Sequence, residues 1–430
     1  MTIIEKITVD FIPEASNPGL IDMFLAPGND RYNMGWLYKN FHSLYADEFL
    51  IQAERKGIAF GKVFGIQGIP ITQLLSASDE YQHMVFEISD RDFIRLPKHY
   101  AKKLLTACNV LITEYIEGGS FFGTNCLQII KNLGVTPLNL FLHTSNYNFK
   151  EIDIPNCTVL PTANLFALII AQSVPEIYRD KEHTKILHHM ITTERSKNEF
   201  KYHAFLSVRK PRESRIKLIA DLHVQKVLTD CLWSMAWSRE DGYLKYEFNN
   251  TPNIKTHQDH AKRTTDKSIK SFLRKYEKAL PKSLPDLPPS FEDTCTNNWM
   301  WATECRWGVS LETFTLKEHP EYINPMGFLT EKTFRLLLNG ITPLILGSAG
   351  ADQELRRIGF RIPDFGWDEL SGGKRREAVT KFITDQHRAN SRHEISQKDY
   401  IEDTQHNMSL FQNKTFLVNL MLTGLKEINV

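Results

Sequence analysis

Residues 203–222 read HAFLSVRKPRESRIKLIADL, a strand-like run followed by a basic turn and a helical repeat of apolar residues. The turn and the start of the helix hold four cations within seven residues, at Arg209, Lys210, Arg212 and Arg215. Open α/β sheets bind ligands at this position, and the free N–H groups of a helix N-terminus favour anions. The segment therefore predicts an α/β fold with an anion-binding site. A basic surface turn is the competing interpretation, because local charge clusters are common.

Short apolar runs alternate with helical repeats on both sides of this segment. The sequence predicts strands at 7–11, 85–88, 110–113, 138–142, 158–160, 203–208, 308–313 and 342–347. It predicts helices at 98–107, 125–133, 164–172 and 216–222, and another that Thr330 caps and Asn339-Gly340 ends. A Gly-rich loop is expected at 57–70, and Gly134 suits a left-handed helix cap. Strands separated by helices of this length require parallel sheets covered on both faces.

The chain of 430 residues is too long for one core and fits two domains. The polar, charged segment 175–200 places the boundary between an N-terminal domain at 1–190 and a C-terminal domain at 200–400. Prolines at 281, 285, 288 and 289 break up the stretch 239–298, which we interpret as an insertion or long loop with one basic helix around 267–280. Residues 401–430 are expected to hold a last helix, at about 410–425, that could pack back across the domain boundary.

The composition argues against several classes of protein. The net charge of +1 is close to neutral, so the overall charge of the molecule does not favour binding to nucleic acid. No apolar run approaches the roughly 20 residues that cross a bilayer, and the N-terminus lacks the pattern of a signal peptide. The six cysteines show no C-x-x-C spacing. These features predict a cytoplasmic protein with free thiols, no membrane span and no structural metal.

One stretch departs from the neutral balance. Residues 255–282 hold nine Lys or Arg against three acidic residues. A solvated helix face is one interpretation, since charge runs usually have that origin. Contact with an anionic acceptor such as double-stranded DNA is the other.

A second segment, 308–347, combines a carboxylate with a helix start. Its first strand leads into Glu312, and the helix that follows has Thr330 as a natural N-cap and Glu331 in its first turn. Capping alone would explain both of these helix residues. Lys332 is different, because a cation in a first turn opposes the helix dipole unless an anion neutralises it. A phosphate at this helix end would remove the conflict, and a nearby carboxylate could hydrogen-bond a ribose diol.

The run FLTEKTF at 328–334, followed by NGITPLILG at 339–347, resembles the donor-site motif of α-1,3-fucosyltransferase-like enzymes. Three further segments resemble glycosyltransferases encoded by tailed bacteriophages. They are the basic loop 209–215, the strand end Leu311-Glu312-Thr313 and the run LRRIGF at 355–360. No motif that we can name covers the N-terminal half.

This resemblance, over about residues 203–222 and 305–385, implies a GT-B enzyme with two Rossmann-like domains facing a central cleft. The co-substrate would be a nucleotide-diphosphate sugar, with no metal or other cofactor, because cations and helix N-termini stabilise the departing diphosphate. Glu331 would bind the donor ribose, and Glu312 would lie near the transferred sugar or the nucleotide. Lys332 would face the diphosphate. The remaining donor-binding candidates are Arg209, Lys210, Arg215 and Thr330.

The base that activates the acceptor hydroxyl is expected from the N-terminal domain. Glu114 and Glu117 follow one predicted strand, and Asp90 and Asp92 follow another. His143, which closes a third strand, is a further candidate. A carboxylate with a raised pKa could remove the proton. For each carboxylate, a solvated loop position is the competing interpretation, since exposed Asp and Glu are common.

The sequence thus predicts a glycosyltransferase, in the host cytoplasm if the chain is viral. The acceptor would be a hydroxymethylated base of phage DNA, which the phage resemblance and the basic stretch favour, or else a glycan. The alternative is an inactive nucleotide-binding or DNA-binding module on the same fold, since no obvious base stands out and a fold does not guarantee activity. The donor sugar, its nucleotide and the stereochemical outcome are left open.

Overall fold

The chain divides into two compact units. The first comprises Met1–Leu165, Pro320–Phe328 and Lys414–Val430, and the second Phe166–His319 and Leu329–Asn413. The domain boundaries expected from the sequence stay predictions. The computed structural model describes residues 63–65, 85–113, 126–144, 146–147, 153–161, 189, 193, 200–208, 212–235, 253–280, 304–312, 327, 329–388, 397–413, 415–416 and 419–420. The strand predicted at 7–11 and the helix predicted at 164–172 lie outside these residues.

The first unit holds a five-stranded, fully parallel sheet whose described strands follow chain order. The strands are β1 (Val63–Gly65), β2 (Val85–Ser89), β3 (Asn109–Thr113), β4 (Asn139–Thr144) and β5 (Cys157–Pro161). The four strands predicted between 85 and 160 are confirmed as β2 to β5. β1 corrects the loop expected at 57–70, because three residues of that Gly-rich region pair with β2 as a strand too short to show a period.

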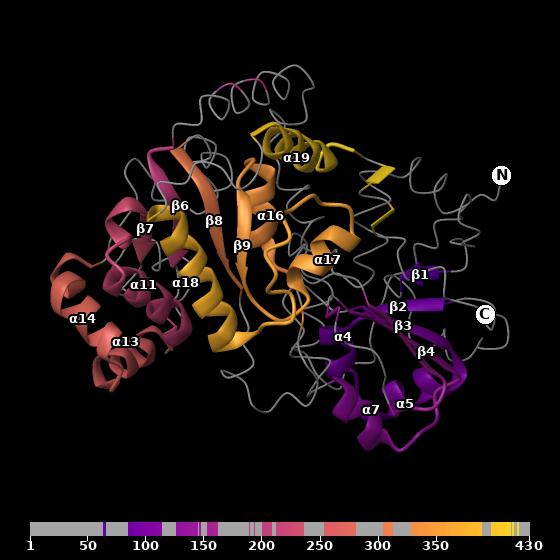
Figure 1. The fold of residues 1–430 in the computed structure, drawn as a ribbon. Coiled ribbons are helices and arrows are strands. Elements are labelled where there is room, and N and C mark those ends of the chain that lie inside the picture. Colours follow the sequence, from indigo (N-terminus) through magenta and orange to yellow (C-terminus); the bar gives the residue numbers. More distant parts are fainter. Residues whose placement is uncertain are drawn as a thin grey trace, which may run out of the picture. The chain divides into compact units, whose positions relative to one another are not determined.

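Within the described part of the first unit, three helices accompany this sheet (Figure 1). They are α4 (Asp90–Arg95), α5 (Lys98–Ala107) and α7 (Leu127–Leu133). α5 has the predicted bounds and buries apolar residues at helical spacing. α7 ends at Gly134, whose φ of 62° is the expected left-handed cap. Alternate residues of the central strands pack with these helices. The strand side chains are Ile88, Val110, Ile112, Leu140 and Leu142, and the helix side chains are Phe93, Leu104, Leu105 and Ile130.

The second unit holds a four-stranded sheet in the order β7-β6-β8-β9, again fully parallel. Its strands are β6 (Tyr202–Val208), β7 (Leu232–Met235), β8 (Cys305–Leu311) and β9 (Thr342–Leu346). β8 is buried along its whole length, as a strand between two others should be. The strands predicted at 203–208, 308–313 and 342–347 are confirmed as β6, β8 and β9. The α/β class with parallel sheets is therefore correct.

Helices of the second unit cover both faces of its sheet. One face packs on α11 (Glu213–Val224) and α18 (Gly372–Arg388), and the opposite face packs on α16 (Glu331–Leu338). Alternation along β6 explains this arrangement, because Ala204, Leu206 and Val208 belong to one core cluster and Phe205 to the other. The helix α17 (Ala351–Arg357) follows β9, and α19 (Gln397–Leu410) packs against α16.

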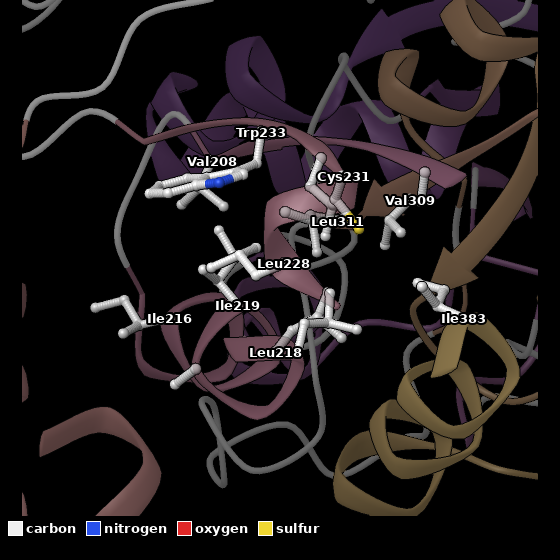
Figure 2. Packing of buried hydrophobic residues seen from close by; sticks show 14 of the residues in the cluster. Val208, Ile216, Leu218, Ile219, Leu228, Cys231, Trp233, Val309, Leu311 and Ile383 are labelled. Carbon is white, nitrogen blue, oxygen red and sulfur yellow. The ribbon is translucent and has the colours of Figure 1, made fainter. Parts of the chain in front are cut away.

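The larger core cluster lies between this sheet and the α11 side (Figure 2). Val208 from β6, Trp233 from β7 and Leu311 from β8 meet Leu218 and Ile219 from α11. Apolar side chains of this size contribute about 1.5–3 kcal/mol each when they leave water, so burial of this cluster stabilises the second unit.

The stretch 239–298 was expected to hold one basic helix, and the described part holds two. They are α13 (Asn253–Arg263) and α14 (Lys267–Tyr276), followed by the 3₁₀ turn η5 (Glu277–Ala279). α14 packs along α11 and buries Ile269, Phe272 and Leu273 in the core. Asp266 caps α14 and pairs with Lys217 of α11, Nζ to Oδ2 at 3.0 Å. The described helix α14 thus contributes to the core of the second unit, and the insertion expected over 239–298 stays a prediction.

The C-terminal part also differs from expectation. A helix, α19, ends at Leu410, where the sequence predicted the last helix to begin. Residues 411–412 form a turn, residues 415–416 and 419–420 are helical, and 414, 417–418 and 421–425 of the predicted last helix lie outside the described residues. α19 escaped prediction because its sequence is mostly polar. Among the described cysteines, Cys108, Cys126, Cys157, Cys231 and Cys305 are free thiols, as predicted.

Candidate functional site

The candidate site lies where the strand order of the second sheet reverses. The chain passes from β6 to β7 on one side, whereas β8 pairs with β6 on the other. Parallel α/β sheets bind ligands at the carboxyl ends of strands at such a point. Arg215 opens α11 there, and Glu312 directly follows β8. The Arg215 Nη2 donates to the Glu312 carbonyl oxygen at 3.3 Å, so the two predicted donor-site residues are in contact.

Glu312 is the centre of a buried hydrogen-bond network and is only 5% exposed. Its Oε1 accepts hydrogen bonds from the Ser310 hydroxyl at 3.0 Å and the Thr333 hydroxyl at 2.5 Å. Its Oε2 accepts a hydrogen bond from the backbone N–H of Thr330 at 3.1 Å. The carboxylate therefore holds the first turn of α16 against the end of β8. A side chain at Gly347 would crowd it, because an added Cβ there would lie 3.2 Å from the Glu312 Cγ.

Thr330 is the N-cap of α16, as the sequence predicts. Its hydroxyl accepts hydrogen bonds from the Lys332 backbone N–H at 3.4 Å and from the Lys332 Nζ at 3.2 Å. The Glu312 carboxylate lies at the same helix end, where negative charge is favourable. The phosphate expected at this end of the helix stays a prediction. The side chain of Glu331 lies outside the described residues.

The structure brings four of the predicted donor-site residues together. Arg215, Glu312, Thr330 and Lys332 meet at the carboxyl end of β8, with a cation on either side of the carboxylate network. Arg215 is 5% exposed and Lys332 is half-buried. A cation that is partly or wholly withdrawn from water there favours anions more strongly than an exposed one would. Arg209 and Lys210 lie outside the described residues.

The structure describes only some of the residues that the sequence suggests as the catalytic base in the first unit. Glu114 and Glu117 lie outside the described residues, as does the side chain of Asp92, whose backbone belongs to α4. Asp90, fully buried, opens the same helix after β2. His143 at the end of β4 is 1% exposed, and neither of its ring nitrogens has a hydrogen-bond partner among the described residues. Burial lowers the pKa of His143 to about 4, so the imidazole is neutral at pH 7.

Sequence reasoning missed two hydroxyl residues that bind the central carboxylate. Ser310 lies two residues before Glu312, on the same side of the strand, and Thr333 lies three residues after the cap Thr330. The sequence signal that could have found them is a hydroxyl residue two positions before the carboxylate and another three positions after the helix cap. It is weak, because Ser and Thr occur in many strands and helix first turns.

A second buried network at the end of β9 was also missed. Arg375 of α18 is fully buried, and its Nε donates to the carbonyl oxygen of Ile345 at 2.6 Å. Its Nη2 is paired with Asp352 of α17, which also accepts a hydrogen bond from the Trp367 Nε1 at 3.0 Å. Burial raises the pKa of Asp352 to about 6, although the charge of Arg375 acts in the opposite direction. This network fixes α17 and α18 to the sheet.

Searches of family models, curated proteins and solved structures find no match to this chain. Within the described ranges, no group of three or more His, Cys, Asp or Glu side chains has the arrangement of a metal site. Those ranges also contain no helix with the length and apolarity needed to span a membrane. The function must therefore be argued from the local geometry.

Proposed function

We propose that the chain is a glycosyltransferase whose nucleotide-diphosphate sugar binds at the carboxyl edge of the second sheet. One observation carries the proposal. Residues from the starts of α11 and α16 converge on the end of β8, at the reversal of strand order, with Arg215 and Lys332 beside the Glu312 network. Such a point is where parallel sheets bind nucleotides, and cations there match a diphosphate. The GT-B arrangement of two domains is part of the proposal.

In the proposed reaction, the acceptor oxygen forms a bond to the anomeric carbon of the donor sugar. The bond from that carbon to the diphosphate oxygen breaks, and the diphosphate leaves with the electron pair. Lys332, with Arg209 and Arg215, would stabilise the negative charge that develops on the leaving group. Glu331 would hold the ribose. The proton of the acceptor hydroxyl passes to a base for which Glu117 is one candidate.

The contacts of Glu312 support a narrower role than contact with the sugar. Both carboxylate oxygens already accept hydrogen bonds, and the side chain is buried. We assign Glu312 as a positioning residue that fixes the first turn of α16, and with it Glu331 and Lys332. Preorganised groups of this kind contribute because they need no rearrangement during the reaction.

The acceptor is either a hydroxymethylated base of DNA or a glycan hydroxyl, and the setting is the cytoplasm. A second candidate function has one observation in its favour. Asp90, at the carboxyl end of β2, is fully buried and so is poorly placed to meet an acceptor, which leaves a nucleotide-binding module without turnover as the alternative. A nucleotide would then bind the same edge and remain unchanged.

The test is hydrolysis of UDP-, GDP- and CDP-sugars by the full chain. We expect one nucleotide class to be turned over, and Lys332→Ala to lower the rate by about 100-fold or more. Glu331→Ala should weaken donor binding. Lys102→Ala, which removes an exposed cation from α5, is the matched control and should leave the rate unchanged. Full turnover by both site variants would discard the site, and tight nucleotide binding without any hydrolysis would favour the inactive module.

A further inference from the structure

One face of α14 carries a row of exposed cations. Lys267, Lys270 and Arg274 lie on the helix at helical spacing, and Lys278 continues the row in η5. We call these four residues the α14 stripe. The opposite face of the helix holds the buried Ile269, Phe272 and Leu273, which pack into the core of the second unit. The register of the helix is therefore fixed, and the stripe is held toward solvent.

The α14 stripe has no counter-ions within the described part of the chain. None of its four side chains forms an ion pair with a described residue. The two acidic neighbours of the stripe pair with other cations, Asp266 with Lys217 at 3.0 Å and Glu277 with Lys262 at 2.8 Å. The guanidinium Nε of Arg274 donates only to the backbone carbonyl of Lys270, at 3.4 Å. Like charges three or four residues apart destabilise a helix. The row is thus unfavourable for the isolated helix and becomes favourable when an extended anion lies along it.

The start of the stripe is linked to α11, the helix that also carries Arg215. The Nζ of Lys217 donates to the Ser268 hydroxyl at 2.5 Å, and Ser268 is next to Lys267 in α14. Lys217 lies on α11, whose first turn holds Arg215, the residue that contacts Glu312. An anion bound along the stripe would therefore lie on a helix that packs along α11, in the unit that holds the proposed donor site. Both elements belong to the second unit.

We propose that the α14 stripe binds the phosphate backbone of double-stranded DNA and so delivers the acceptor, an inference that rests on the proposed function. The stripe covers eleven residue steps, or about 16 Å, and duplex DNA presents one charge per about 1.7 Å of its axis. Several phosphates can meet the stripe at once.

Two features favour duplex DNA over other polyanions. Binding to an anionic membrane surface needs exposed apolar anchors, and the exposed large apolar residues of the described part, Leu138 and Val224, lie outside α14. Single-stranded nucleic acid is gripped by exposed aromatic rings on which bases stack, and the aromatic residues of α14, Phe272 and Tyr276, are buried or half-buried.

The test measures DNA binding without any sugar donor, so its failure is distinct from a failure of sugar transfer. Anisotropy of a labelled duplex would be followed with the full chain at about 50 and about 200 mM NaCl. Four phosphate contacts predict a slope of about −3.6 in log K against log salt, or a weakening of about 100-fold between these conditions. The variant K267Q/K270Q/R274Q/K278Q should weaken binding at low salt by about 100-fold or more and flatten the slope.

Two further variants separate the stripe from net charge and from misfolding. K98Q/K102Q/K103Q/K131Q removes four exposed cations from α5 and α7 of the first unit, with the same change in net charge, and should keep the wild-type slope. K267R/K270R/R274K/K278R keeps the charges and should keep the affinity. The proposal is overturned if the two Gln variants bind equally, if wild type does not bind duplex DNA, or if it prefers acidic vesicles or single strands.

Discussion

Removing the carboxylate of Glu312 should release the first turn of α16. In Glu312→Ala, the buried N–H of Thr330 loses its acceptor, which costs about 1–3 kcal/mol. The hydroxyls of Ser310 and Thr333, 2.7 Å apart, can bond to each other and lose less. With the packing of the side chain included, we expect a loss of about 3 kcal/mol. Glu312→Gln keeps one acceptor and should lose about half of that.

Hydrogen exchange of the α16 amides is the direct assay, since it reports local opening within a chain of two units. A loss of about 3 kcal/mol accelerates exchange by about 100-fold, because 1.4 kcal/mol corresponds to tenfold. The control is Glu304→Ala. Glu304, just before β8, forms a solvent-exposed pair with Lys201 at 3.6 Å, so its removal should leave exchange close to that of wild type. If exchange in Glu312→Ala stays within a few fold of wild type, the carboxylate does not hold the helix.

Three other substitutions test the packing and the titration of the fold. Arg375→Met leaves the buried Asp352 carboxylate without its partner and should cost about 3–5 kcal/mol in urea unfolding, whereas a cost under about 1 kcal/mol would contradict the network. Gly308→Ala places a Cβ 2.5 Å from the Leu336 Cδ2 and should lower the free energy of unfolding by about 1–3 kcal/mol. Adding Leu336→Ala to the same chain removes the clashing atom and should restore part of that loss. Burial lowers the pKa of His143 from its ordinary value of 6.5 to about 4. Below about pH 6.5, the imidazole therefore takes up a proton in the unfolded chain but stays neutral in the folded state until the pH approaches 4. Stability should therefore fall by about 2 kcal/mol between about pH 7.5 and about pH 5, and His143→Leu should flatten this part of the melting-temperature profile.

Most of the sheet framework follows from local sequence patterns. The strands β2 to β5, β6, β8 and β9 are apolar runs bounded by turn residues, and α5 shows its buried face as Ala101, Leu104 and Leu105. β1 and β7 are only three and four residues long, too short for a period to appear. α13 and α19 are mostly polar, so their helical state depends on tertiary contacts rather than on a hydrophobic pattern.

The candidate site could be predicted only in part. The types of Arg215, Glu312, Thr330 and Lys332 drew attention to two separate segments. Their contact depends on β6 and β8 being neighbours, which is a property of strand order and not of local sequence. The anion at the start of α16 is an example. The sheet brings Glu312, eighteen residues before Thr330, to the first turn of α16, where its carboxylate accepts a hydrogen bond from the Thr330 N–H.

The pairing of β6 with β8 has a consequence for how the molecule is made. Arg215 and Glu312 are 97 residues apart in the chain, whereas β6, α11 and β7 are contiguous. On the ribosome, the contiguous elements and α14 emerge before β8, and they can bury Ile269, Phe272 and Leu273 in advance. Insertion of β8 then completes the sheet and carries the carboxylate to its partners. A nascent chain should thus become compact well before it gains affinity for any ligand of this edge.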